Sequence, residues 1–253
     1  MNKFIDAVKV LIALNIVLFA IPFLFPEMEK TLPQLLALYF PKNPNFQYWQ
    51  LVTSMFMHGG FAHLLLNMYG LWAFGTPLEA MWGKNKFLLF YFISGIGANL
   101  IYLAVNYYQF DSTYSELLSA GLSAENIQAI LNTGSYDTSI TQTITTEQLT
   151  RFYQIFHTPA VGASGAVYGV LVAFGMAFPN AKLALIFLPV PIAAKYFIPV
   201  LITIDLFSGV TGFSIFGGSI AHFAHVGGAA VGFLLVLLWR NKTTRPQVEQ
   251  DNY

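Results

Sequence analysis

The chain has 253 residues, of which 56% are hydrophobic and 9% are charged, and its mean hydropathy is +0.58. Soluble domains carry about 25% charged residues, so this composition excludes an ordinary soluble domain and predicts a polytopic membrane protein. A formal net charge of zero gives no reason to expect a nucleic-acid partner. Because the chain has no cysteine, disulfides, thiolate catalysis and sulfur metal ligands are excluded. We separately expect no cofactor and no metal.

The N-terminal segment places Lys3 and Lys9 ahead of an apolar run, as a signal peptide does. No small-residue cleavage pattern follows this run. It leads instead to Pro22, Pro26 and a charged patch that begins at Glu27. We therefore expect the segment to be retained as the first membrane-spanning helix.

Membrane-spanning helices need about 20 mostly apolar residues. Six candidate spans cover residues 10–25, 61–81, 87–105, 159–178, 196–210 and 223–239. Upstream of the fifth, the apolar stretch 183–194 contains Pro189 and Pro191, so it can lie along the membrane interface instead of spanning. The sequence predicts an all-α polytopic membrane protein, a bundle of six transmembrane helices that forms a single domain, 1–253.

Two connections are not membrane-like. Residues 27–54 form a loop rich in proline and aromatic residues, which suits the headgroup region. Residues 106–158, between the third and fourth spans, are polar throughout. Within them, Ser123 and the pair Thr145 and Thr146 precede an acidic residue in a first helical turn, as N-caps do. We expect a small helical insertion.

Lysine and arginine are divided unequally between the two sides that alternating spans define. The side with the N-terminus carries nine, namely Lys3, Lys9, Lys84, Lys86, Lys182, Lys195, Arg240, Lys242 and Arg245. The other side carries three, namely Lys30, Lys42 and Arg151. Positive residues favour the cytoplasmic side. We therefore expect both termini in the cytoplasm, the insertion outside, and an inner or plasma membrane as the location.

The first cluster of chemical interest lies at the outer end of the second span and contains His58, His63 and Asn67. His63 and Asn67 are four residues apart, so a helix places them on one face, where both can donate hydrogen bonds to a common point. This arrangement suits an oxyanion hole. In an alternative interpretation, the two polar side chains only tie neighbouring helices together.

The second cluster opens the fourth span and contains Gly162, Ser164, Gly165, Tyr168 and Gly169. Glycines beside a serine at a helix start permit close approach of another backbone, and the serine amide is an unsatisfied donor. Taken alone, the pattern fits close helix packing equally well.

The third cluster lies in the last span and contains His222, His225, Gly228 and Gly232. The two glycines share a helical face with His225, so this face can press against a neighbouring helix and bring the imidazole with it. A histidine inside a membrane span is a functional candidate. Its ordinary pKa of about 6.5 suits a base that activates serine.

The three clusters, in this order and spacing, resemble those of the rhomboid intramembrane serine proteases. The resemblance covers residues 49–239 and implies a six-helix rhomboid-like bundle. It further implies that Ser164 attacks the scissile carbonyl and that His225 accepts its proton. His63, Asn67 and the backbone amide of Ser164 would hold the oxyanion.

The resemblance also implies several supporting roles. Tyr168 would pack against the catalytic histidine, His58 would be structural or retain water, and Glu79 would be a structural carboxylate near the cytoplasmic end of the second span. Gly162, Gly165, Gly228 and Gly232 would permit the helix contacts. Asp205 falls at the end of the fifth helix, the family's lateral gate for substrate, and nothing in its position gives a reason for it to face His225. We therefore expect a Ser/His dyad without a third member.

Two features depart from the family pattern. Gln50 follows Trp49 where the family often has arginine, which bears on one anchoring interaction of the first loop. The insertion at 106–158 is longer than in compact bacterial members and can shape access to the site.

The expected function is cleavage of single-span membrane proteins within the lipid bilayer, near the extracytoplasmic face. One alternative is a catalytically silent rhomboid-like protein that binds membrane helices, although such relatives generally lack the serine or histidine. Another is a small transporter, which would show paired intramembrane carboxylates or internal repeats.

Overall fold

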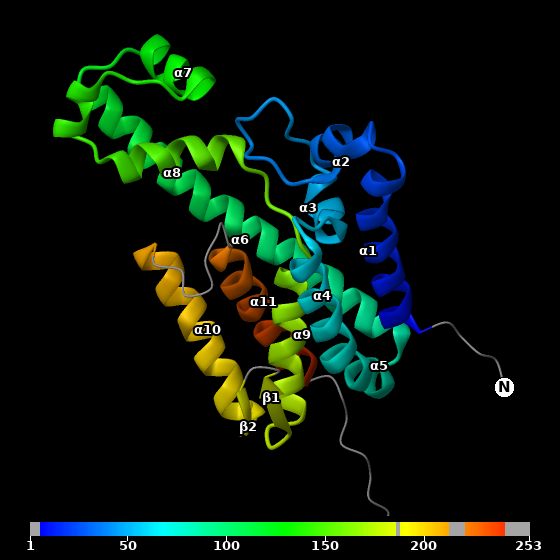
Figure 1. The fold of residues 1–253 in the computed structure, drawn as a ribbon. Helices are drawn as coiled ribbons and strands as arrows, with labels where there is room; N and C mark the ends of the chain where they lie inside the picture. Colours follow the sequence, from blue (N-terminus) through cyan, green and yellow to red (C-terminus); the bar gives the residue numbers. More distant parts are fainter. Residues whose placement is uncertain (1–5, 186–187, 213–220, 241–253) are drawn as a thin grey trace, which may run out of the picture.

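The computed structural model describes residues 6–185, 188–212 and 221–240, which are almost entirely helical (Figure 1). The first half contains α1 (Ala7–Leu24), α2 (Met28–Leu36), α3 (Gln50–Thr53), η1 (Ser54–Phe56), α4 (Phe61–Gly70), η2 (Leu71–Gly75), α5 (Thr76–Trp82) and α6 (Lys84–Ser119). The second half contains α7 (Ala124–Thr133), η3 (Thr138–Gln142), α8 (Thr146–His157), α9 (Ser164–Ala177), β1 (Lys182–Leu185), β2 (Leu188–Ala193), α10 (Ala194–Thr211) and α11 (His222–Arg240). The predicted helical class is confirmed.

Four of the described helices, α1, α6, α10 and α11, are long and apolar enough to cross a membrane. They correspond to the first, third, fifth and sixth predicted spans. The second predicted span consists of α4, the π-helical turn η2 and α5, and the fourth corresponds to the shorter apolar helix α9. Each predicted span therefore has a helical counterpart, while the count of six membrane crossings stays a prediction.

Helix α9 lies at the centre of the bundle. Figure 1 shows it between α4 on one side and α10 and α11 on the other, and α6 also packs against it. Its side chains Ala166, Val170 and Ala173 are fully buried. Ser164 is the first residue of α9, so it lies at one end of the helix that the neighbouring helices surround.

The start of α1 and the C-terminal ends of α5 and α11 lie together, at the opposite end of the bundle from the start of α9 (Figure 1). The carboxylate of Glu79 accepts hydrogen bonds from the amides of Ala7 at 2.5 Å and Val8 at 2.9 Å, and so caps the start of α1. The rings of Trp82 and Trp239 contact each other, with centroids 6.1 Å apart. The structural role expected for Glu79 is therefore that of a helix cap.

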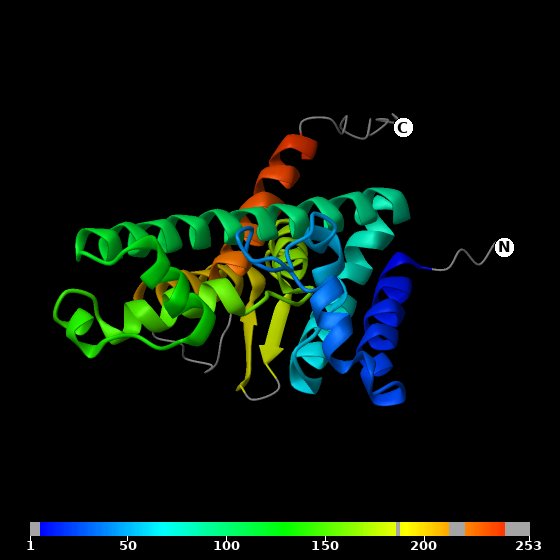
Figure 2. The same ribbon diagram turned by 90° about the horizontal axis from the view of Figure 1, so that it is seen from above.

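Helix α6 extends well beyond the bundle. At 1.5 Å per residue its 36 residues span about 54 Å, whereas the hydrocarbon core of a bilayer is about 30 Å thick. Figure 2 shows α6 as one continuous helix that runs out to the insertion. The predicted start of the insertion at residue 106 consequently falls inside a helix, and α7 and α8 pack on the projecting part around Phe110 and Phe152.

The two predicted N-caps of the insertion are present. The side chain of Ser123 accepts a hydrogen bond from the amide of Asn126 and caps α7, with Glu125 in its first turn. Thr145 and Gln148 form a capping box at the start of α8. These local signals predict the helices because cap and capped amide lie within one turn.

The stretch at 183–194, for which an interfacial position is the alternative to spanning, contains the antiparallel strands β1 and β2. Lys182 pairs with Ala193, and Leu183 pairs with Ile192. Strands are not predictable from this part of the sequence, because an apolar run with two prolines shows neither a clear helical nor an alternating pattern.

Gln50 organises the first loop. Its side chain is fully buried and makes four hydrogen bonds to backbone groups. Its Oε1 accepts from the amides of Tyr39 and Gln47, and its Nε2 donates to the carbonyls of Gln34 and Asn45. The glutamine that replaces the family's arginine therefore anchors the loop itself.

Candidate active site

Glycines bring α9 and α11 into backbone contact, as the predicted shared face of His225 requires. A Cβ added to Gly228 would lie 1.8 Å from the carbonyl oxygen of Gly165. One added to Gly232 would lie 2.6 Å from the Cα of Gly169. No side chain fits at Gly228 or Gly232, so these residues set the distance between the two helices.

Ser164 and His225 meet across this contact. The Oγ of Ser164, the first residue of α9, lies 2.8 Å from Nε2 of His225, which is in the first turn of α11. The ring of Tyr168, one turn further along α9, stacks on the imidazole with centroids 4.3 Å apart and planes at 12°. The structure thus brings together the predicted nucleophile, base and packing ring in a hydrogen-bonded arrangement.

The first loop fixes the segment that precedes Ser164. Leu38 and Ala160 exchange two backbone hydrogen bonds of 2.9 Å and 2.8 Å, and the amide of Gly162 donates to the carbonyl of Ser54. Gly162 has a φ of +127°, a conformation that favours glycine. The loop that Gln50 organises therefore also determines where the serine sits.

Two of the three predicted oxyanion donors border the hydroxyl of Ser164, namely the ring of His63 and the backbone amide of Ser164 itself. A Cβ added to Gly162 would lie 2.8 Å from Nε2 of His63 and 3.5 Å from Oγ of Ser164, so His63 borders the serine. The amide of Ser164 occupies the first position of α9, where a helix supplies no acceptor. Asn67 is buried on the same face of α4, and its Nδ2 donates to the carbonyl of His63. One of its two amide hydrogens is thus used within the helix.

His58 lies behind His63, with the two rings in edge contact and centroids 5.0 Å apart. Its imidazole is buried, and neither ring nitrogen has a hydrogen-bond partner among the residues that the structure describes. Buried polar atoms of this kind usually bind an ordered water. The arrangement agrees with the structural or water-retaining role that the resemblance implies.

The expectation that Asp205 does not face His225 is wrong. Its Oδ1 lies 3.2 Å from Nδ1 of His225, because one face of α10 packs against α11. A signal for this contact exists in the sequence, because the spacing of Asp205, Ser208 and Gly209 puts them on one helical face. In the structure all three are buried. Small and polar residues at this spacing mark the side of α10 that approaches a neighbour.

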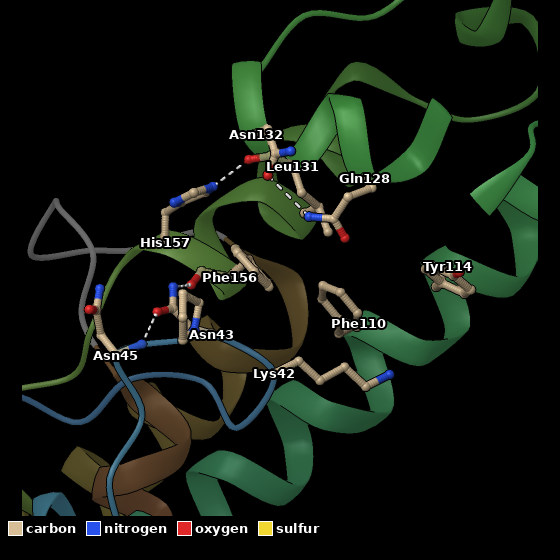
Figure 3. Close-up of a pocket in the computed structure, with 11 residues that line it drawn as sticks. Lys42, Asn43, Asn45, Phe110, Tyr114, Gln128, Leu131, Asn132, Phe156 and His157 are labelled. Atoms are coloured by element: carbon tan, nitrogen blue, oxygen red, sulfur yellow. Dashed lines mark hydrogen bonds between the residues drawn. The ribbon is translucent and has the colours of Figure 1, made fainter. Parts of the chain in front are cut away.

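A cavity of about 540 Å³ lies elsewhere, between the first loop and the insertion (Figure 3). Figure 3 shows Lys42 beside Phe110 of α6, with Asn132 of α7 and His157 of α8 on the opposite side. None of the predicted site residues lines it. The cavity is therefore separate from the Ser164 site.

Comparison with known proteins agrees with this architecture. A rhomboid domain matches residues 45–242 of the chain. The chain is 29% identical over 184 residues to "Rhomboid protein 1, mitochondrial" of Saccharomyces cerevisiae, an alignment that covers 73% of the chain and 40% of that protein. It is 25% identical over 240 residues to the human "Presenilin-associated rhomboid-like protein, mitochondrial", which covers 92% of the chain and 49% of that protein. The chain thus spans less than half the length of these two relatives.

A shorter similarity relates the chain to "Rhomboid-like protease 3" of Toxoplasma gondii, with 42% identity over 73 residues, or 29% of the chain and 28% of that protein. The names of the yeast and human relatives place those two proteins in mitochondria, so the comparisons do not support the plasma-membrane location expected from the sequence. The domain match and the apolar helices show an integral membrane protein. With most of its length matched by the rhomboid domain, this chain belongs to the rhomboid family.

Proposed function

We propose that the chain is an intramembrane serine endopeptidase, which uses Ser164 and His225 to cleave the membrane-spanning helices of other proteins. The observation that carries the proposal is the 2.8 Å separation between Oγ of Ser164 and Nε2 of His225. Serine is a weak nucleophile until a base accepts its proton, and this geometry provides that base. The opposing helices hold the pair through glycine contacts that leave little room for displacement.

In the proposed reaction, Oγ of Ser164 bonds to the scissile carbonyl carbon while its proton passes to Nε2 of His225. The imidazolium then gives this proton to the leaving amine as the peptide C–N bond breaks. A water molecule, deprotonated by the same imidazole, hydrolyses the acyl ester and restores the serine hydroxyl. His58, whose buried ring nitrogens lack protein partners among the described residues, is suited to retaining water near the site.

The oxyanion formed during attack requires hydrogen-bond donors placed before the reaction. The amide of Ser164 and the ring of His63 border the serine hydroxyl and can supply two. Asn67 can supply a third through the Nδ2 hydrogen that does not bond to the carbonyl of His63. Loss of one such donor typically lowers kcat by about 10²- to 10³-fold.

The proposed substrates are single-span membrane proteins. A helix hides its carbonyl groups in hydrogen bonds, so a substrate must unwind locally before Ser164 can attack. Glycine or proline near the cut favours this unwinding, and the family resemblance adds a preference for small residues before the scissile bond.

For the orientation in the bilayer, the nine positive residues assigned to the side of the N-terminus favour the cytoplasm for that side. Glu79 and Trp82 lie at the end of the bundle where α1 starts and α11 ends. The start of α9, which is Ser164, and the insertion lie toward the other end (Figure 1). Cleavage would then occur near the extracytoplasmic face.

The alternative function is that of a catalytically silent protein that binds membrane helices without cutting them. It is favoured by the family membership alone, since rhomboid proteins include silent members. The hydrogen-bonded serine and histidine favour the protease instead.

The test is cleavage of a single-span substrate, with glycine near its extracytoplasmic end, by the purified protein in detergent. Wild type should cleave, and Ser164→Ala and His225→Ala should each lower kcat by several orders of magnitude. Ser208→Ala is a matched control, because it removes a buried hydroxyl from α10 that has no hydrogen-bond partner among the described residues. Cleavage that persists in Ser164→Ala would contradict the proposal, and a wild type inactive on every such substrate would favour the silent alternative.

A further inference from the structure

Asp205 connects α10 to side chains of α9 and α11 beside the proposed catalytic pair. Its Oδ1 accepts hydrogen bonds from Nδ1 of His222 at 2.6 Å and from Nδ1 of His225 at 3.2 Å. Its Oδ2 accepts a hydrogen bond from the hydroxyl of Tyr168. We infer that Asp205 is a positioning residue, which holds His225 in the orientation and tautomer required for accepting the proton of Ser164; this inference rests on the proposed function.

The hydrogen bond to Asp205 determines which nitrogen of His225 carries the proton. A carboxylate only accepts hydrogen bonds, so Nδ1 of His225 must be the donor. The neutral imidazole then has its lone pair on Nε2, the atom that lies 2.8 Å from Oγ of Ser164. The other tautomer would present a hydrogen to the serine and could not act as its base.

Tyr168 and Asp205 hold the imidazole from two directions. The ring of Tyr168 stacks on the face of His225, and the hydroxyl of the same tyrosine bonds to Asp205 at the edge of the imidazole. The Asp205 side chain is only 8% exposed. A buried carboxylate needs several hydrogen bonds to replace its water, and three donors surround this one.

The spacing of the three groups fits hydrogen bonds better than shared metal ligation. Two ligand atoms of a tetrahedral zinc ion, each about 2.0–2.2 Å from the metal, lie about 3.3 Å or more apart. The 2.6 Å between His222 and Asp205 is well below that separation. The cluster is therefore best described as a hydrogen-bond network centred on Asp205.

The network depends on the docking of α10. The outer face of this helix is exposed at Val200, Phe207 and Val210, whereas Asp205 and Gly209 face α11. A Cβ on Gly209 would lie 3.1 Å from the ring of Phe223, so the approach is close. Movement of α10 away from α11 would remove the carboxylate of Asp205 from His225. The position of α10 therefore determines whether His225 is held as a base for Ser164.

The test measures the reactivity of Ser164 separately from substrate entry. A small fluorophosphonate probe reacts with an activated serine, and mass spectrometry identifies the labelled residue. In Asp205→Asn, both the labelling rate of Ser164 and kcat should fall about 10²-fold or more, because the amide can donate to Nδ1 and favour the wrong tautomer. KM should stay within about twofold of wild type. Asp111→Asn, which alters an exposed acid on α6, is the matched control.

The outcomes separate the two proposals. A wild type that neither cleaves substrate nor labels at Ser164 contradicts the proposed function itself. Labelling of wild type and Asp205→Asn at equal rates overturns the positioning role and leaves the proposed function intact, as does a change confined to KM.

If Asp205→Asn does not fold, Tyr168→Phe provides the decision. This variant keeps the ring that stacks on His225 and removes the hydroxyl that holds Asp205. The labelling rate should fall about fivefold, as expected for loss of one hydrogen bond. An unchanged rate overturns the inference.

Discussion

Gly228→Ala should abolish substrate cleavage, because the added methyl group moves His225 away from Ser164. The added Cβ would lie 1.8 Å from the carbonyl oxygen of Gly165, and ordinary contact begins at 3.4 Å, so α11 must retreat by about 1.6 Å. If His225 moves with α11 by this full amount directly away from Ser164, the distance from Nε2 of His225 to Oγ of Ser164 grows from 2.8 Å to about 4.4 Å. A misplacement of about 1 Å can lower the rate about 10²-fold.

Overpacking in a core typically costs about 1–3 kcal/mol, and a clash with the backbone of Gly165 lies at the upper end of that range or above it. The fold of Gly228→Ala is therefore measured together with its activity. Substrate cleavage and the thermal unfolding midpoint are measured on the same detergent-purified sample. Gly60→Ala is the matched control, since a Cβ there has no neighbour within 4 Å. Cleavage by Gly228→Ala within about threefold of wild type would refute the reasoning that glycine contacts set the Ser164–His225 distance.

Three further substitutions test the supporting structure. Gln50→Ala should lower the free energy of unfolding by about 3–5 kcal/mol and reduce cleavage, because four buried backbone groups lose their partners; the exposed Gln128→Ala should change stability by less than about 0.5 kcal/mol, and equal effects would be inconsistent with an anchoring role. Glu79→Gln should lower the unfolding midpoint, since the first two amides of α1 lose a charged acceptor worth about 1–2 kcal/mol; an unchanged midpoint argues against the cap. Thr145→Ala should speed hydrogen exchange at the start of α8, because the capping box is lost; unaltered exchange would contradict its contribution.

Local signals in the sequence predict much of this fold. The caps at Ser123 and Thr145 are read within one helical turn, and the apolar runs locate a helix for each predicted span. The glycine spacing around Gly228 predicts a close contact with a neighbouring helix. These features depend on residues that are near one another in the chain, where periodicity and chemistry determine the structure directly.

The contacts that the sequence does not reveal join residues from different elements. Asp205 reaches His225 because α10 docks on α11, and a linear pattern does not state which faces of two helices meet. Gln50 anchors the first loop through backbone groups at four separate positions, so its partners carry no side-chain signature. The hairpin of β1 and β2 lacks the alternation of polar and apolar residues that predicts a strand.

The most direct test of the central claim is to map the residue that a fluorophosphonate probe modifies in the folded protein. A serine activated by His225 predicts a single phosphonylated residue, Ser164, with labelling lost in His225→Ala and kept in Ser208→Ala. Absence of labelling at Ser164 in wild type, or labelling that survives in His225→Ala at the wild-type rate, would contradict the account that the 2.8 Å contact forms a catalytic pair.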